Sequence, residues 1–247
     1  SKYGMLDTRT EALVEAIRNT SPPGGFSVLV DGGTAGVIDY VNTLYTAFPL
    51  ALLLVALITY VVLMLLFRSL VLPLKAILMN ALSILASYGA LVFIFQQGHF
   101  SNLLNFTPLG FVEASSPILM FCALFGLSMD YEVFLLSRIR EEWLRTGDNS
   151  TAVADGLAVT GRIITAAAAI MFCVFGSFVI KDPLHILKVF GLGLAVAVLI
   201  DVTLVRMVLV PSIMELLGPV NWWMPKFLQR SVPTIGVEVT PEKVPTP

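Results

Sequence analysis

Three long stretches without an acidic, basic or histidine side chain limit this chain to folds in which whole helices lie in apolar surroundings. Residues 40–67, 76–98 and 163–180 contain no Asp, Glu, Lys, Arg or His. Each is close in length to the roughly 20 apolar residues that a helix needs to cross the hydrocarbon core of a bilayer. Only 13% of the residues are charged, against about 25% in an average soluble domain. The alternative, a large soluble core, would require several apolar helices with no amphipathic face.

Two further apolar spans, 116–137 and 184–205, contain a few acidic or basic residues. The residues that interrupt them are Asp130, Glu132, His185, Lys188 and Asp201. We therefore predict an α-helical integral membrane protein with five transmembrane helices. The expected helices are Thr46–Phe67, Val71–Phe95, Ser116–Ser137, Ile163–Ile180 and Leu184–Val205.

The residues before the first span have the pattern of a folded segment. Apolar positions at helical spacing predict a helix over 8–19, and Phe26–Val30 has the pattern of a strand that ends at the turn beginning with Asp31. A segment of about 40 residues is too small to fold alone. We therefore expect residues 1–45 to be the end of a larger α+β domain, and the chain to be part of a longer protein.

The basic residues predict the orientation and the remaining domain boundaries. Lys and Arg are frequent at one set of helix ends and rare at the other, which indicates that residues 1–45 lie outside the cytoplasmic membrane and the C-terminus inside. The transmembrane domain is expected over 46–218, with cytoplasmic linker helices over 138–160. Residues 219–247 are expected to form an interfacial segment around Trp222 and Trp223, followed by a disordered tail.

Asp130 is the strongest candidate for a functional residue. It lies inside an apolar span, where an ionised carboxylate costs a few kcal/mol unless it faces protein or water. A carboxyl group in such surroundings suits uptake and release of protons, and the neighbouring Tyr131 has a hydroxyl that can donate to a carboxylate on a facing helix. We interpret Asp130 and Tyr131 as a proton relay. The alternative is that Asp130 only pairs with a polar neighbour and holds helices together.

Other polar residues of the spans have weaker signals. Glu132 faces away from Asp130 on a helix, so it either contacts water, bonds Ser128 or shares the proton path. Asp201 either forms a structural salt bridge, with Arg206 as a possible partner, or takes part in proton transfer. We count Glu132, Ser128 and Asp201 as possible support for the relay. Small residues suited to close helix packing lie at Gly126, Gly193 and Ala197.

Several classes of activity find no support in the sequence. The chain has no GxxxxGK[ST], HExxH or GxSxG motif, so nucleotide hydrolysis and covalent catalysis are not indicated. Cys122 and Cys173 both lie within spans, which makes a disulfide or a metal site an unfavourable interpretation. The formal net charge of −2 says nothing about partners. We expect no cofactor, no metal and no nucleic acid.

Several segments resemble the MmpL family of the resistance–nodulation–division superfamily, over about residues 25–230. The most specific is FGLSMDYEVFLLSRIREE at Phe125–Glu142. The others are FRSLVLPLKA at Phe67–Ala76, GLGLAVAVLIDVTLVR at Gly191–Arg206, NWWMP at Asn221–Pro225 and DGGTA at Asp31–Ala35.

The resemblance implies a fold, a function and a partner. It implies the C-terminal half of a transporter, in which the end of an extracytoplasmic porter domain precedes five helices. It implies a secondary active transporter, not an enzyme, that exports lipids or other hydrophobic molecules from the cytoplasmic membrane as protons enter. The Asp-Tyr pair of the family maps onto Asp130 and Tyr131, which would meet a matching pair in the N-terminal half. The alternatives are a lipid or sterol sensor of the same fold without proton coupling, and a structural subunit that needs a partner chain.

Overall fold

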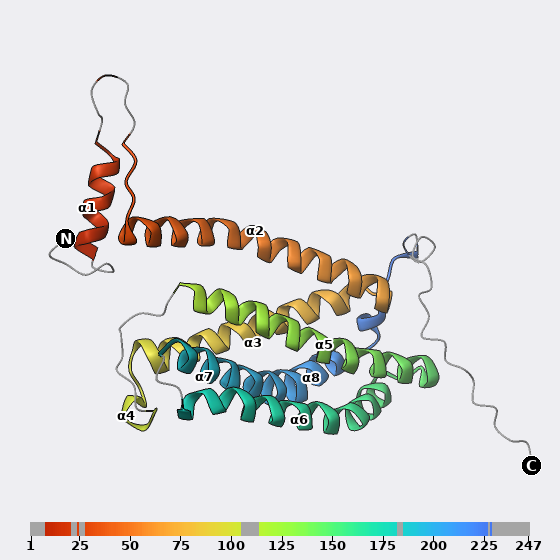
Figure 1. The fold of residues 1–247 in the computed structure, drawn as a ribbon. Coiled ribbons are helices and arrows are strands. Elements are labelled where there is room, and N and C mark those ends of the chain that lie inside the picture. Colours follow the sequence, from red (N-terminus) through yellow and green to blue (C-terminus); the bar gives the residue numbers. More distant parts are fainter. Residues whose placement is uncertain are drawn as a thin grey trace, which may run out of the picture. The chain divides into compact units, whose positions relative to one another are not determined.

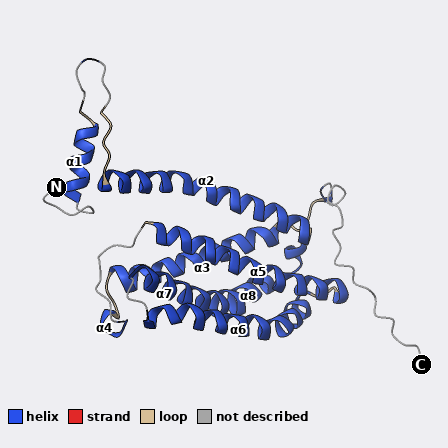
Figure 2. Cartoon of the chain, viewed as in Figure 1, coloured by secondary structure: helices blue, strands red, loops and turns tan. Residues whose placement is uncertain are grey.

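The computed structural model describes residues 8–20, 24, 28–104, 114–181, 185–226 and 228. The chain divides into two compact units, Ser1–Leu54 and Val55–Pro247. Helix α2, Gly33–Phe67, contributes residues to both. Every regular element of the described residues is helical, as Figure 2 shows. The tail expected after Ser231 lies outside the described residues.

The N-terminal unit holds the predicted first helix but no strand among its described residues. Helix α1 spans Thr8–Arg18, and its last residue donates two hydrogen bonds to the carboxylate of Asp39, with the closest atoms 2.6 Å apart. The strand predicted over 26–30 is wrong for residues 28–30, which form no strand, and residues 26 and 27 lie outside the described part. A strand needs a neighbouring strand for its backbone hydrogen bonds, and the described residues offer none.

The prediction of five membrane helices is confirmed, because five helices of the described chain are long and apolar enough to cross a bilayer. The first is α2. The second is α3, Val71–Leu91, continued by the π-helical η2, Val92–Gln96. The third is α5, Ser115–Thr146, and the fourth is α6, Asn149–Lys181. The fifth runs through α7, His185–Ile200, the π-helical η3, Asp201–Leu209, and α8, Val210–Leu217. It ends at Gly218, whose φ is 53°, and the 3-10 turn η4, Gly218–Trp222, follows. The short helix α4, Ser101–Leu104, follows η2.

Four of the five membrane helices extend beyond their predicted ranges, whereas the second, predicted over Val71–Phe95, ends within one residue of its prediction. The helices expected as a cytoplasmic linker over residues 138–160 are continuous with two of the membrane helices. Those residues are the end of α5 and the beginning of α6. The break between them is short. Gly147 ends α5 in a left-handed conformation, with φ of 70°, which glycine adopts without a steric penalty. The carboxylate of Asp148 then accepts a hydrogen bond from the amide of Thr151 at 2.8 Å and so caps α6.

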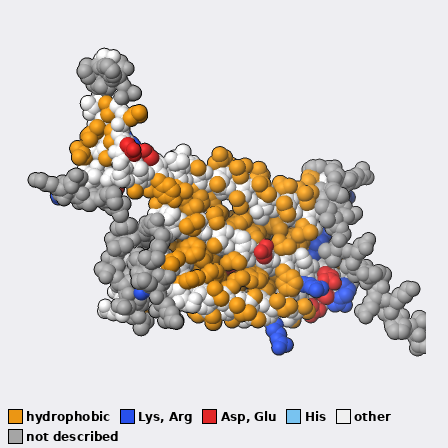
Figure 3. Space-filling model, in the orientation of Figure 1, with side chains coloured by type: hydrophobic (Ala, Val, Ile, Leu, Met, Phe, Trp, Pro, Cys, Tyr) orange, Lys and Arg blue, Asp and Glu red, His pale blue; other side chains and the backbone are white. Residues whose placement is uncertain are grey.

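Helices α3, α5, α6 and α7 form one bundle in the second unit. Figure 1 shows them side by side, and α7 packs against the other three. Small residues allow the close approach: a Cβ at Gly193 would lie 2.8 Å from the thioether of Met120 on α5, and Ala197 is fully buried. The face of the bundle drawn in Figure 3 is mostly hydrophobic, and charged side chains gather at one of its ends.

Candidate functional site

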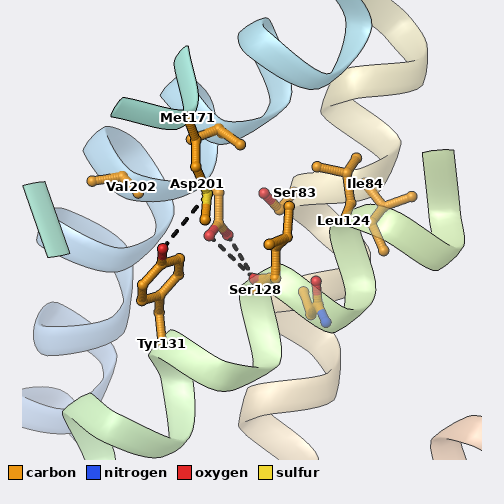
Figure 4. Close-up of a pocket in the computed structure, with 11 residues that line it drawn as sticks. Ser83, Ile84, Leu124, Ser128, Tyr131, Met171, Asp201 and Val202 are labelled. Carbon is orange, nitrogen blue, oxygen red and sulfur yellow. Dashed lines mark hydrogen bonds between the residues drawn. The ribbon is translucent and has the colours of Figure 1, made fainter. Parts of the chain in front are cut away.

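The two residues of the predicted relay lie on different faces of α5. Asp130 is exposed in the described chain, as is Gly126 one turn earlier, and a Cβ at Gly126 would meet no atom within 4 Å. Tyr131 is half-buried and points toward α6 (Figure 4), where its hydroxyl lies 3.5 Å from the sulfur of Met171. The step of about 100° between neighbours on a helix separates the two side chains.

A buried network joins α5 to the fifth membrane helix. The hydroxyl of Ser128 donates to the carboxylate of Asp201, 3.1 Å from each oxygen, as Figure 4 shows. The guanidinium of Arg206 lies 2.8 Å from the same carboxylate and also donates to the carbonyl of Ser128 at 2.7 Å. All three side chains are buried, and Arg206 is only 1% exposed. The carboxylate is thereby paired and hydrogen-bonded, which is the condition for keeping a charge in a low-dielectric interior.

Arg206 also connects this network to Tyr131. Its guanidinium carbon lies 5.4 Å from the centre of the Tyr131 ring, within the range of a cation–π interaction. The ring of Tyr131 therefore lies directly beside the Asp201–Arg206 ion pair. The structure thus brings together Tyr131, Ser128 and Asp201, three of the candidates from the sequence, and it adds Arg206 as their common neighbour.

A second set of buried polar groups lies on α3 and α5. The ammonium of Lys75, the side-chain amide of Asn80 and one carboxylate oxygen of Glu132 are buried without a hydrogen-bond partner among the described residues. Glu132 is 3% exposed and Lys75 is 5% exposed. Buried polar groups without partners are uncommon in folded proteins. Lys75 and Glu132 carry opposite charges, but no hydrogen bond or ion pair between them is found among the described residues. Unpaired polar atoms of this kind are where a water molecule can bind.

Sequence reasoning did not single out Lys75 and Asn80 as members of a polar site. Lys75 is one of the basic residues near the helix ends, yet it lies a full turn inside α3. Its position within a helix bounded by apolar residues was a usable signal, since a lysine there faces either protein or the membrane surface. Asn80, a lone amide in an apolar run, gave a weaker one.

A small cavity lies between these two sets of groups. Its volume of about 10 Å³ is close to the minimum that holds one water molecule. It is lined by polar side chains of α3, α5 and η3, with apolar side chains around them, as Figure 4 shows. The polar members are Asn80, Ser83, Ser128, Tyr131 and Asp201. The cavity has room for one water molecule at most, and it is far too small for a lipid.

No metal site accompanies this cavity in the part of the chain that the structure describes. No three His, Cys, Asp or Glu side chains come together there. Cys122 and Cys173 are both free thiols on the outside of the bundle.

These features define a multi-pass membrane protein with a buried polar network between its helices. The sequence model of the MMPL family matches residues 6–238, so the chain belongs to that family, as the motifs predicted. It is 42% identical over 234 residues to the probable transport protein MmpL11 of Mycobacterium leprae, covering 94% of this chain and 23% of that protein.

Two other relatives are similar over the same region. The trehalose monomycolate exporter MmpL3 of Mycobacterium tuberculosis is 44% identical over 223 residues, covering 90% of this chain and 23% of the relative. The membrane protein YdfJ of Bacillus subtilis is 39% identical over 235 residues, covering 95% of this chain and 32% of the relative. The matched region therefore spans 23–32% of the length of these relatives.

Proposed function

We propose that the protein to which this chain belongs exports lipids or other hydrophobic molecules across the cytoplasmic membrane, and that proton entry through Asp130 and Tyr131 drives the export. The observation that carries this proposal is the position of Asp130. It is an exposed carboxylate on α5, a membrane-spanning helix of the described chain. A charge at that depth is tolerated only against protein or water.

The exposed face of α5 supports a partner for Asp130 outside this chain. Gly126 and Asp130 lie one turn apart on that face, and the space beside Gly126 is open. A small residue next to a carboxylate allows another helix to approach closely. The N-terminal half of the same transporter is the proposed neighbour, because the relatives are three to four times longer than this chain. Asp130 would then exchange its proton at the junction of the two halves.

Tyr131 supplies the link from Asp130 to the inside of the bundle. Its ring borders the small cavity and lies beside Arg206, which holds Asp201 and Ser128. Protonation of Asp130 removes a charge next to Tyr131 along the chain, and the altered hydrogen bonding shifts α5 against the helix of Arg206. Each entering proton supplies about 2.3 kcal/mol per 100 mV of membrane potential. We propose that three further polar residues position the relay and are not its primary proton carriers. They are Ser128, Asp201 and Glu132.

The names of two relatives support a lipid cargo. One relative is called a trehalose monomycolate exporter and another, from Mycolicibacterium smegmatis, a mycolic acid-containing lipids exporter. Both cargo types are large and hydrophobic, and the cavity beside Tyr131 admits no such molecule. The cargo path is therefore proposed to lie elsewhere in the full-length protein.

The test is gradient-driven export by the full-length protein in proteoliposomes. The probes are a fluorescent trehalose-linked lipid and an internal pH-sensitive dye, read before and after a proton gradient is imposed. Asp130→Asn is expected to lower gradient-dependent export and proton uptake together by tenfold or more, because an amide side chain neither takes up nor releases a proton at working pH. Tyr131→Phe, which removes only a hydroxyl, is expected to lower both less severely.

The matched control is Asp155→Asn, which neutralises an exposed carboxylate near the start of α6. It is expected to export as the unmodified protein does. Full gradient-dependent export by Asp130→Asn would rule out the relay. Lipid binding without any response to the gradient, in the unmodified protein, would favour a sensor in its place.

A further inference from the structure

A second cavity lies at the end of the bundle where charged side chains gather. Its volume is about 260 Å³, and it is lined by Arg68, Arg140, Trp143 and Trp222. Two of these side chains are guanidinium groups and two are indoles, and none of the lining residues in the described part of the chain is acidic. The cavity is separate from the proposed proton relay, and nothing argued below depends on that relay.

The aromatic and basic side chains of the cavity are packed against one another. The rings of Trp143 on α5 and Trp222 on η4 stack, with centroids 5.5 Å apart and planes 8° from parallel. The guanidinium carbon of Arg140 lies 5.6 Å from the Trp222 ring, close enough for a cation–π interaction. Arg140 also donates to the backbone carbonyl of Phe67, at the end of α2. The arginine is thus held in place from two directions.

Hydrogen bonds fix the η4 segment to the turn between α2 and α3. The hydroxyl of Ser69 donates to the carbonyl of Asn221 at 2.6 Å, and the amide of Leu70 donates to the carbonyl of Trp223 at 3.2 Å. The indole of Trp222 donates to the side chain of Asn149, at the start of α6, at 3.3 Å. The cavity wall is therefore made of three segments, the α2–α3 turn, α5 and η4, which are tied to one another and to α6, and this is how a preorganised binding site is built.

Arg68 occupies its turn at a conformational cost. Its φ is 47°, in the left-handed region, where residues with a Cβ are uncommon and glycine is unstrained. Glycine would adopt this backbone conformation without strain. Strained backbone positions of this kind are frequent at ligand-binding sites, where the side chain contacts the ligand. Here the side chain lines the same cavity as Arg140.

We propose that this cavity binds the phosphate of an anionic membrane lipid at the cytoplasmic surface. Paired guanidinium groups match a phosphate in charge and in hydrogen-bond geometry. Tryptophan is enriched at the headgroup level of membranes, and basic pockets between membrane helices on this side suit anionic headgroups. Three hydrophobic side chains of the same segments are more than half exposed and would lie along the acyl chains. They are Leu144, Val220 and Trp223.

The experiment measures lipid retention by the full-length protein. The protein is exchanged into nanodiscs of phosphatidylglycerol with phosphatidylcholine, released into mild detergent and examined by native mass spectrometry for bound lipid. Arg68→Gly and Arg140→Gln are each expected to lower retained phosphatidylglycerol about tenfold, since each variant removes a charge-assisted hydrogen bond to the phosphate. Arg68→Gly also removes the strained backbone position, so a loss of binding in this variant does not come from a loss of fold.

The matched control is Arg138→Gln, two positions before Arg140 on the same helix, where the arginine is exposed and pairs with Glu141. It is expected to retain phosphatidylglycerol at the unmodified level. An equal loss in Arg138→Gln would show that only general surface charge is measured, and would overturn the site. Equal retention of phosphatidylcholine and phosphatidylglycerol would overturn it as well. Displacement of the lipid by millimolar inorganic phosphate would assign the site to free phosphate and overturn the lipid proposal.

Discussion

The guanidinium of Arg206 and the carboxylate of Asp201 lie 2.8 Å apart, although the residues are five positions apart on one helix. On an α-helix this spacing places two side chains about 140° apart, on different faces. Residues 201–209 are π-helical, and the i→i+5 hydrogen bonds of that helix bring such residues onto one face. The local change of helix type is therefore what allows both side chains to point at Ser128 on α5.

The first prediction concerns the stability of this pair. Asp201→Asn or Arg206→Met alone leaves one buried charge without its counter-charge, and each is expected to cost about 3–5 kcal/mol. The double variant removes both charges and is expected to be more stable than either single variant. The measurement is the thermal unfolding of the full-length protein in detergent.

A second ion pair of nearly the same length provides the control for this prediction. Arg138 and Glu141 lie 2.7 Å apart but are both exposed. Neutralising either residue is expected to change stability by less than about 1 kcal/mol, because water screens the pair. The buried-pair interpretation fails if the effects of Asp201→Asn and Arg206→Met simply add in the double variant.

The membrane helices could be predicted from the sequence, and the π-helix could not. A stretch such as 76–98 contains no Asp, Glu, Lys, Arg or His, and it is as long as a helix that crosses the bilayer. These two properties are enough to predict a membrane helix there. The sequence did indicate Arg206 as a possible partner of Asp201, yet at α-helical spacing the two would diverge. The π-helical hydrogen-bond pattern depends on what α5 offers as a neighbour, and that information is absent from the local sequence.

The second prediction concerns the connection between the α2–α3 turn and η4. Ser69 is fully buried; its hydroxyl donates to the carbonyl of Asn221 and accepts from the amides of Val71 and Leu72 at 3.1 and 3.2 Å. Ser69→Ala leaves these buried groups unpaired and is expected to cost about 1–3 kcal/mol. Thermal unfolding measures the loss. The control is Ser177→Ala on an exposed face of α6, with an expected change within about 0.5 kcal/mol. Equal effects of the two variants would contradict the prediction.

The third prediction is a pH dependence at the start of α6. Hydrogen bonds from the side chain and the backbone of Thr151 hold the pKa of the Asp148 carboxyl below its usual value of 3.8. A lowered pKa means that the carboxylate stabilises the helix end above that value, and that this contribution is lost as the pH falls through the pKa of the folded state. Asp148→Ala is therefore expected to lower the hydrogen-exchange protection of the Thr151 amide severalfold at neutral pH, and by a progressively smaller factor as the pH falls below 3.8.

The measurement compares exchange rates, each divided by the unfolded rate at the same pH, from about pH 7 to about pH 3. Asp148→Asn serves as the control, because asparagine caps a helix without a charge. It should retain protection and show no change with pH in this range. A constant difference between the unmodified protein and Asp148→Ala at every pH would contradict the role of the ionised carboxylate.

The faces of α5 show which part of the candidate site the sequence could reveal. Helical spacing alone places Asp130 and Glu132 about 200° apart, and in the structure Asp130 is exposed whereas Glu132 is buried. Spacing does not tell which face meets the rest of the bundle. The grouping of Glu132 with Lys75 and Asn80 depends on how α3 packs against α5, and a single sequence contains no direct record of that packing.

The last prediction compares three glycines that differ only in what surrounds them. A Cβ at Gly156 on α6 would lie 2.6 Å from the Ile139 side chain and 3.0 Å from the Ile139 backbone, which has no room to move. A Cβ at Gly193 would meet only flexible side-chain ends, those of Met120 and Leu91. Gly156→Ala is expected to cost about 1–3 kcal/mol through overpacking, and Gly193→Ala less.

At Gly89 nothing lies within 4 Å, so Gly89→Ala is expected to raise stability by about 0.5–1 kcal/mol through helix propensity. Thermal unfolding of the full-length protein ranks the three variants. A larger loss for Gly193→Ala than for Gly156→Ala would mean that α5 and α6 are less tightly locked than α5 and α7, and would contradict the packing described here.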